Sequence, residues 1–180
     1  MPSPVFTVKN GAFDDFLSVY DPTTQIKTKL LFRASGNRNP VERARIMNRL
    51  LDDGADPSAE AEYGSTLLGV LEAEHDPMVD GPLLERLIAY GANVNFLERK
   101  GDRPIDYIRR MMGVRDADRW PYYKAIFESG TLNLDLPKNP RHPDGPTCRV
   151  SFANSTGADR FPVLYAYFNA WATRNPRPAT

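Results

Sequence analysis

The sequence predicts an all-α protein in which helical hairpins stack into a solenoid. One observation is a phrase that occurs three times: an apolar pair, two further residues, a glycine, and then small and polar residues. The glycines of these phrases are Gly54, Gly91 and Gly130, which lie 37 and 39 residues apart. The other observation is that signals for helix starts precede each phrase. A near-constant spacing of this kind indicates a repeat architecture.

Each repeated phrase is typical of the end of a helix. The apolar pair, for example Leu50-Leu51, completes an amphipathic helix. The glycine then adopts the left-handed backbone conformation that stops the helix. The polar residues that follow favour a turn and an extended crossing to the next hairpin.

Every repeat is expected to contain two helices, and each helix has its own start signal. Serine, threonine or asparagine can cap the first free N–H groups, and proline fits the first helical position. In the second helix of the first repeat, Glu42 adds an acid three residues after the cap, as in a capping box. The expected start residues are Thr28, Thr66 and Pro104 for the first helices, and Asn39-Pro40, Gly81-Pro82 and Trp120-Pro121 for the second helices.

Segments outside the repeats are expected to cap the stack or to connect its parts. Residues 1–23 predict an N-terminal cap around Phe13–Tyr20. Residues 136–147 are rich in proline and glycine, which favours an extended linker or a segment that wraps the body. Residues 148–180 predict a C-terminal cap made of a short strand over Cys148–Phe152 and a helix that starts at Pro162.

Residues 24–135 resemble three ankyrin repeats. The pattern of that family begins with Gly-x-Thr-Pro-Leu-His and ends with Leu-Leu-x-x-Gly-Ala-Asp-x-Asn. The phrase Gly91-Ala92-Asn93-Val94-Asn95 is very close to this ending. The chain departs from the pattern because Leu31, Gly69 and Asp106 stand where the family has histidine, and because each repeat is several residues longer between its two helices. The resemblance implies an ankyrin-type solenoid of about three repeats with a capping element at each end.

Composition excludes several classes of protein. The 180 residues suit one domain, and 23 basic residues balance 23 acidic ones, which argues against general nucleic-acid binding. The single cysteine, Cys148, cannot form an internal disulfide, so we expect a reducing, cytoplasmic environment. No apolar run reaches the length of a membrane span, so we expect no membrane partner.

Few residues in the chain suit catalysis. His75 and His142 are the only histidines, and neither belongs to a zinc-binding H-E-x-x-H arrangement. Cys148 has no base near it in the sequence, and no glycine-rich phosphate loop is present. We therefore expect no catalytic residues, no metal and no cofactor.

The charges are distributed unevenly along the chain. Residues 50–85 contain ten acids and no lysine or arginine, which indicates either a solvated face or an acidic band that attracts a basic protein. The ankyrin resemblance implies binding through the turn tips and the concave face of the first helices. Tyr63 and Phe96 are expected either to anchor the partner or to pack between repeats. The expected contact residues are Glu60, Glu62, Tyr63, Ser65, Glu72, Glu74, Phe96, Glu98, Arg99, Lys100, Asp102 and Arg110.

These observations lead to one preferred function and two alternatives. We expect a monomer that binds another protein of basic character. Small ankyrin-type proteins of bacteria include some that are thought to be immunity or antitoxin proteins, which block a co-encoded toxin. The alternatives are an adaptor or effector that binds a host or cellular protein, and an enzyme of unrecognised type.

Overall fold

The computed structural model describes residues 3–154 and 157–176, and all the regular elements in this part are helical, as the sequence predicts. One isolated antiparallel bridge joins Pro137 and Thr147. The elements are α1 (Pro4–Asn10), α2 (Phe13–Val19), α3 (Lys27–Ala34), α4 (Pro40–Asp52), α5 (Glu60–Tyr63), α6 (Thr66–Glu72), α7 (Pro77–Ala89), α8 (Pro104–Arg110), the 3-10 helix η1 (Asp116–Arg119), α9 (Trp120–Phe127), α10 (Cys148–Ala153) and α11 (Pro162–Arg174).

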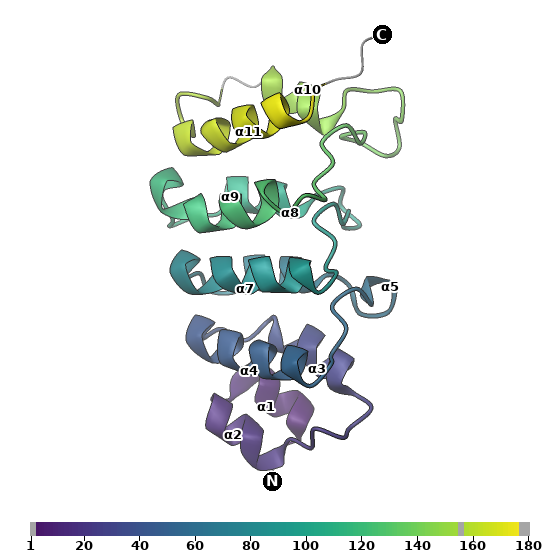
Figure 1. Cartoon of the computed structure of the whole chain (residues 1–180), viewed down its shortest axis with the longest axis vertical. Helices are drawn as coiled ribbons and strands as arrows, with labels where there is room; N and C mark the ends of the chain where they lie inside the picture. The colour runs from purple at the N-terminus through teal and green to yellow at the C-terminus, as the bar shows by residue number, and fades with distance from the viewer. Residues whose placement is uncertain (1–2, 155–156, 177–180) are drawn as a thin grey trace.

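The helices form pairs that follow one another along the long axis of the molecule (Figure 1). Helices α4, α7, α9 and α11 lie in one row, which we call the outer row, and each contacts the next. Helices α3, α6 and α8 form a second, inner row, and each contacts its neighbour in the same way. Helices α1 and α2 cover the N-terminal end, and α10 and α11 lie at the other end.

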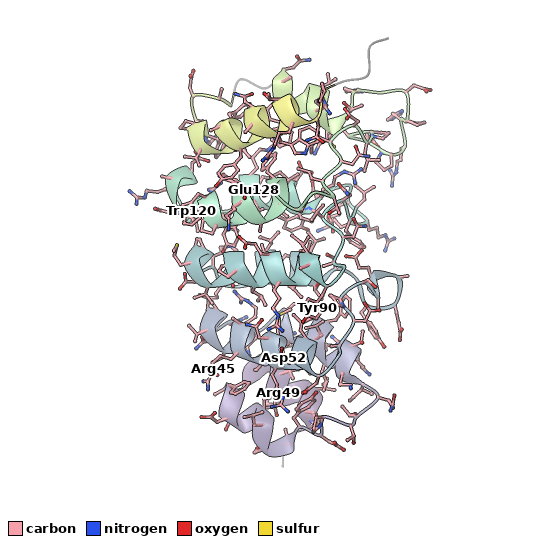
Figure 2. The ribbon with its side chains drawn as sticks, viewed as in Figure 1. Arg45, Arg49, Asp52, Tyr90, Trp120 and Glu128 are labelled. Carbon is pink, nitrogen blue, oxygen red and sulfur yellow. The ribbon has the colours of Figure 1, made fainter. Side chains whose placement is uncertain are left out.

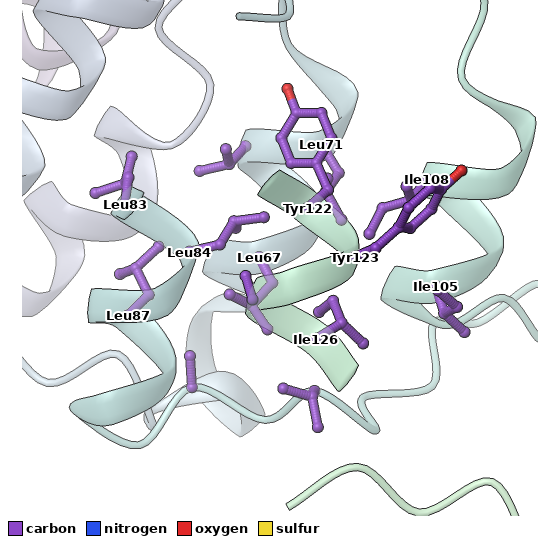
Figure 3. Close-up of a cluster of buried hydrophobic side chains, with 14 of the residues drawn as sticks. Leu67, Leu71, Leu83, Leu84, Leu87, Ile105, Ile108, Tyr122, Tyr123 and Ile126 are labelled. Atoms are coloured by element: carbon purple, nitrogen blue, oxygen red, sulfur yellow. The ribbon is translucent and has the colours of Figure 1, made fainter. Parts of the chain in front are cut away.

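One apolar core runs through all the pairs, from Val8 in α1 to Trp171 in α11. Figure 3 shows its central part, where leucines of α6 and α7 meet Ile105 and Ile108 of α8 and the rings of Tyr122 and Tyr123 of α9. Burying one leucine side chain stabilises a fold by about 1.5–3 kcal/mol. Since no pair could bury its apolar face alone, the pairs depend on one another for stability.

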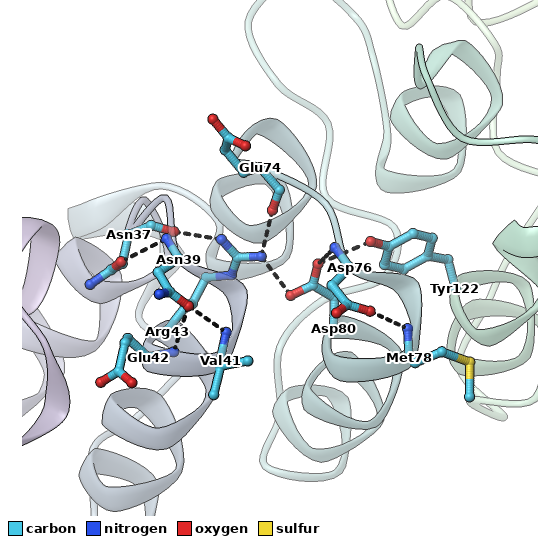
Figure 4. A network of polar contacts seen from close by, with 10 residues as sticks. All are labelled: Asn37, Asn39, Val41, Glu42, Arg43, Glu74, Asp76, Met78, Asp80 and Tyr122. Carbon is cyan, nitrogen blue, oxygen red and sulfur yellow. Dashed lines mark hydrogen bonds and ion pairs between the residues drawn. The ribbon is translucent and has the colours of Figure 1, made fainter.

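A charged network crosses the core at the start of the outer helices (Figure 4). The guanidinium of Arg43 in α4 lies 2.6 Å from the carboxylate of Asp80 in α7, and both side chains are fully buried. The second oxygen of Asp80 accepts hydrogen bonds from the Tyr122 hydroxyl and from the Asp76 backbone N–H, each at 3.0 Å. The network therefore links α4, α7 and α9 with polar contacts inside an apolar stack.

The three predicted helix-stopping glycines are confirmed. Gly54, Gly91 and Gly130 have φ angles of 88°, 106° and 74°, in the region that side chains disfavour. After the first two, the next backbone N–H reaches back across the helix end: Ala55 donates to the Leu50 carbonyl and Ala92 donates to the Leu87 carbonyl. The helix ends were thus predictable from local sequence.

Some predicted helix starts are confirmed and others are wrong. Asn39, Pro104 and Pro162 stand where expected. Neither predicted threonine is a cap, because α3 starts at Lys27, before Thr28, and Ser65 caps α6 in place of Thr66.

The predicted start at Gly81-Pro82 is also wrong. Helix α7 begins earlier, at Pro77, because the Asp76 carboxylate accepts the Met78 N–H at 3.1 Å. Aspartate therefore supplies a side-chain cap, which Gly81 cannot. Pro82 therefore lies inside the helix.

The C-terminal segment differs from its prediction in two ways. Cys148–Phe152 is not a strand but part of α10, because the Thr147 hydroxyl accepts the Val150 N–H and caps a helix that buries Cys148 and Phe152 on one side. Residues 136–147 form a closed loop instead of an extended linker, since Lys138 donates to the Pro146 carbonyl and Cys148 donates to the Leu136 carbonyl, both at 3.0 Å. The C-terminal cap is consequently a further helix pair.

The N-terminal cap is also a pair. Helix α2 lies where the sequence predicts a capping element, and α1 precedes it. The buried amide of Asn37 donates to the carbonyls of Val8 and Gly11, which ties α1 to the loop before α4.

Candidate binding face

Three loops connect successive pairs on the same side of the molecule, at the right in Figure 1. They comprise residues 56–65, which include α5, residues 93–103, and residues 131–147. These loops and the adjoining exposed side chains of α6 and α8 are here called the loop face. The sequence-predicted contact residues belong to the loop face or lie at its border, except Glu74, which lies in the turn between α6 and α7 at the opposite end of α6.

A repeated hydrogen bond ties each loop to the helix pair or loop that precedes it. The donor is a backbone N–H two or three residues after the helix-stopping glycine, and the acceptor is a side chain of the preceding pair or loop. The residue that donates this N–H also stabilises the turn in which it lies, because its side-chain oxygen accepts a hydrogen bond from the backbone N–H two residues later. The ties join the N–H groups of Asp56, Asn93 and Asn133 to Thr28 Oγ1 at 3.0 Å, Glu60 Oε1 at 3.3 Å and Asn95 Oδ1 at 2.7 Å.

Fewer of the acids in residues 50–85 form an unpaired acidic surface than the sequence predicts. Most of these acids serve the fold: Asp76 caps α7, Asp80 is buried, and others pair with cations of the same or the next outer helix. Asp52 is the last residue of α4 and lies in the outer row (Figure 2). The surface pairs are Asp52–Arg86 at 2.5 Å, Asp53–Arg49 at 2.7 Å and Glu85–Lys124 at 2.8 Å. The acids left on the loop face are Asp56, Glu60, Glu62 and Glu72, whereas Glu74 lies in the turn between α6 and α7, at the opposite end of α6 from the loops.

Among these four acids, Glu60 has a structural role. Its half-buried carboxylate accepts the Asn93 N–H and so holds the second loop against the first. Burial raises the pKa of Glu60, and the hydrogen bonds from Asn93 and Ser65 oppose this shift only in part. We therefore assign Glu60 to the scaffold of the loop face and not to its contact surface.

Glu60→Gln is expected to flatten the pH dependence of stability. A raised pKa means that the folded chain keeps a proton that the unfolded chain has lost. The wild type should therefore lose stability as the pH rises from the ordinary pKa of glutamate, near 4.5, through the folded value. Glutamine stays neutral and its carbonyl oxygen still accepts the Asn93 N–H. Urea unfolding between about pH 4 and pH 8 measures the difference, and an equal slope in both proteins would contradict the burial argument.

The two predicted aromatic anchors differ in exposure. Tyr63 is 36 % exposed, and its ring leans on Phe32 of the preceding pair with a centroid separation of 5.2 Å. It therefore combines packing between pairs with an open edge. Phe96 is half-buried within the second loop. Ser65 serves as the cap of α6, where its hydroxyl accepts the Leu68 N–H.

A shallow depression of about 350 Å³ lies between α6, α8 and the second loop. Arg110 crosses it to pair with Asp102 at 2.5 Å, and the guanidinium also lies over the ring of Tyr107 at 5.7 Å from the centroid. Burial and then the Glu72 carboxylate raise the pKa of the Tyr107 hydroxyl, so this hydroxyl remains a donor at neutral pH. The depression thus presents paired polar groups to a partner.

A larger groove of about 1060 Å³ separates the tips of the second and third loops. It brings four predicted residues, Glu98, Arg99, Lys100 and Asp102, together with Lys138 and Arg141. The last two were not predicted because residues 136–147 were expected to form a linker. Two charged residues of the groove already form ion pairs: Lys138 with Asp106 at 2.6 Å, and Asp102 with Arg110. The lining residues are Leu97, Glu98, Arg99, Lys100, Gly101, Asp102, Lys138, Asn139, Pro140 and Arg141.

The loop face therefore has two electrostatic halves. Asp56, Glu62 and Glu72 make the half around the first loop and α6 acidic. Arg99, Lys100 and Arg141 are exposed and form no ion pair with any residue that the structure describes, which makes the half around the groove cationic. The signal in the sequence was the return of cations after Glu85, but it gave no indication that the third loop would join them.

Within residues 3–154 and 157–176, no hydrogen bond joins any two of the side chains of His75, His142 and Cys148. Cys148 is buried in α10, His142 is exposed on the third loop, and His75 lies half-buried between α6 and α7, where burial lowers its pKa. Within the same residues, no group of three histidine, cysteine or acidic side chains could hold a metal ion. None of the helices described is long and apolar enough to cross a membrane.

Comparisons with known proteins relate the chain to a solved structure. No family model matches the sequence, and no curated protein does. The fold resembles the crystal structure of a functionally unknown protein from Leptotrichia buccalis C-1013-b, with a TM-score of 0.73 and 18% sequence identity. The match covers 98% of this chain and 96% of that chain, so the two share a fold over nearly their whole length.

Proposed function

We propose that this chain is an ankyrin-type solenoid that binds another protein through its loop face and performs no reaction. The stacked pairs, the glycine-stopped helices and the loops tied in series support the ankyrin-type assignment. Loops that hydrogen bonds tie to a helical scaffold favour binding because fewer conformations are lost when a partner docks.

One observation carries the choice of partner. Asp56, Glu62 and Glu72 stand on the loop face and form no ion pair with the described residues. Unpaired acids of this kind speed association with a basic surface and select the sign of the partner. In its most specific form, the proposal is an immunity-type protein whose acidic half covers the basic cleft of a co-encoded toxin.

Charge reversal on the loop face tests this proposal. The variant Glu62→Lys/Glu72→Lys changes two exposed acids that form no ion pair with the described residues. The control Asp14→Lys/Glu128→Lys makes the same change in net charge on α2 and at the end of α9, where Figure 2 shows Glu128 on the outer row. Both variants should keep the wild-type circular dichroism and melting temperature.

Binding is measured by surface plasmon resonance against the protein encoded beside this gene, at low and physiological salt. We expect the loop-face variant to weaken binding by about tenfold or more, chiefly through slower association, and the control to bind like the wild type. Absence of any complex at low salt would contradict the immunity role. An equal loss in both variants would contradict the assignment of the surface.

A further inference from the structure

The groove between the second and third loops has a charge opposite to that of the acidic half. We propose that this groove is a second binding site, which takes an acidic peptide segment. The inference extends the proposed function to the cationic half of the loop face. Its test uses a synthetic peptide, so it can fail while the acidic half still binds a basic partner, and the reverse also holds.

The cations of the groove are available to a ligand. Arg99 and Lys100 lie at the tip of one loop and Arg141 at the tip of the other, and all three are exposed. None of them forms an ion pair with a residue that the structure describes, whereas Lys138 below them is held by Asp106 at 2.6 Å. A carboxylate that enters from solvent would therefore meet three uncommitted donors, and arginine binds carboxylates through two parallel hydrogen bonds.

The size of the groove favours a segment of chain over a single ion. Its volume of about 1060 Å³ is slightly above the usual range for small-molecule sites, about 300–1,000 Å³. Leu97 and Pro140 add apolar surface to opposite walls. A short peptide with acidic and apolar side chains could use both kinds of contact.

Glu98 distinguishes a peptide from a polyphosphate ligand. This residue lines the groove, and its Oε1 atom is buried without a hydrogen-bond partner among the described residues. A buried acceptor without a donor is costly, so a ligand that supplies an N–H group would gain by binding there. A peptide backbone carries N–H groups, whereas a phosphate backbone carries none.

The neighbouring acids oppose a nucleic acid as well. Glu72 lies next to the groove on the loop face, beside Lys100, and Asp102 lies within the groove. A long polyanion would have to pass these carboxylates, while a short acidic segment can stay within reach of the three cations.

Fluorescence anisotropy with a labelled peptide of alternating glutamate and leucine tests the proposal. The groove variant is Arg99→Glu/Arg141→Glu, and the matched control is Arg33→Glu/Arg38→Glu, which reverses two exposed arginines that lack ion pairs on α3 and the loop after it. We expect the peptide to bind the wild type and the control alike and the groove variant at least about tenfold more weakly. A peptide with glutamine in place of glutamate should bind at least about tenfold more weakly to the wild type.

A third variant gives a test of sign. Glu98→Ala makes the groove more positive, so pure electrostatics predicts tighter binding of the acidic peptide. If Glu98 accepts a peptide N–H, the variant should instead bind several-fold more weakly. Amide shifts in a two-dimensional NMR titration should fall on residues 97–102 and 138–141.

Several outcomes would overturn the inference. These are no binding of the acidic peptide at low salt, equal losses in the groove variant and its control, amide shifts confined to other parts of the chain, or tighter binding of Glu98→Ala. Tighter binding of a single-stranded oligonucleotide of equal charge would assign the groove to nucleic acid instead.

Discussion

Replacing Asp80 with alanine is expected to destabilise the folded chain by about 3–5 kcal/mol. The substitution leaves the fully buried guanidinium of Arg43 without its carboxylate, which lies 2.6 Å away in the wild type. It also removes the acceptor of the Tyr122 hydroxyl and of the Asp76 N–H. Since these groups belong to α4, α7 and α9, the loss is expected to weaken three helix pairs together.

Matched variants separate the charge from the hydrogen bonds. Asp80→Asn keeps an acceptor and the side-chain shape, so it should cost less than Asp80→Ala. Tyr122→Phe removes one hydrogen bond and should cost about 1 kcal/mol. The double variant Arg43→Met/Asp80→Leu removes both charges and should recover most of the stability lost by Asp80→Ala.

Urea unfolding, followed by circular dichroism, gives the free energies of this series. A loss below about 1 kcal/mol for Asp80→Ala would mean that water or a rearranged side chain replaces the carboxylate. In that case the buried network would not be a main contributor to the contact between α4 and α7.

The second large effect is expected at Gly81. Replacing a helical glycine with alanine usually stabilises the fold, but Gly81→Ala should destabilise it. In an open helix interior, alanine in place of glycine stabilises by about 0.5–1 kcal/mol. A Cβ atom on Gly81 would lie 2.4 Å from the Cβ of Pro121 and 3.1 Å from its carbonyl carbon. Neither the proline ring nor its backbone can move aside freely, so Gly81→Ala should destabilise by about 1–3 kcal/mol.

Gly36→Ala is the control for Gly81→Ala, because an added Cβ there meets no atom closer than 3.8 Å. Its free energy of unfolding should change by less than about 0.5 kcal/mol. Thermal and urea unfolding of the two variants give the comparison. If Gly81→Ala proved more stable than the wild type, helices α7 and α9 would have to lie further apart than in this structure.

The close approach at Gly81 also explains one error of prediction. In sequence, Gly81-Pro82 has the form of a turn followed by a helix start. In the structure the glycine lies against Pro121 of the next pair, and the helix has already begun at Pro77. The residue is small because of a contact 40 positions away in the chain, and local patterns carry no information on such contacts.

On the loop face too, some residues could be predicted from the sequence and others could not. Glu62, Tyr63, Glu98, Arg99 and Lys100 lie on the loops, where the resemblance to ankyrin repeats predicts them. Their partners Lys138 and Arg141 were not predicted, because only the closed loop at 136–147 brings them to the groove.

The acids of the run 50–85 were predicted as one band for a similar reason. Their composition is visible in the sequence, but the cations that neutralise Asp52, Asp80 and Glu85 come from helices 34, 37 and 39 residues away. Pairing over such distances depends on how the helices pack.

The sequence by itself determined the helical class, the stops at Gly54, Gly91 and Gly130, and the starts at Asn39, Pro104 and Pro162. These features depend on backbone conformation and on hydrogen bonds within a few residues. Only the tertiary structure decided which charges are buried, which are paired and which face solvent between the loops. Charges act through space and lose solvation when they are covered, so their roles follow from packing and not from their order in the chain.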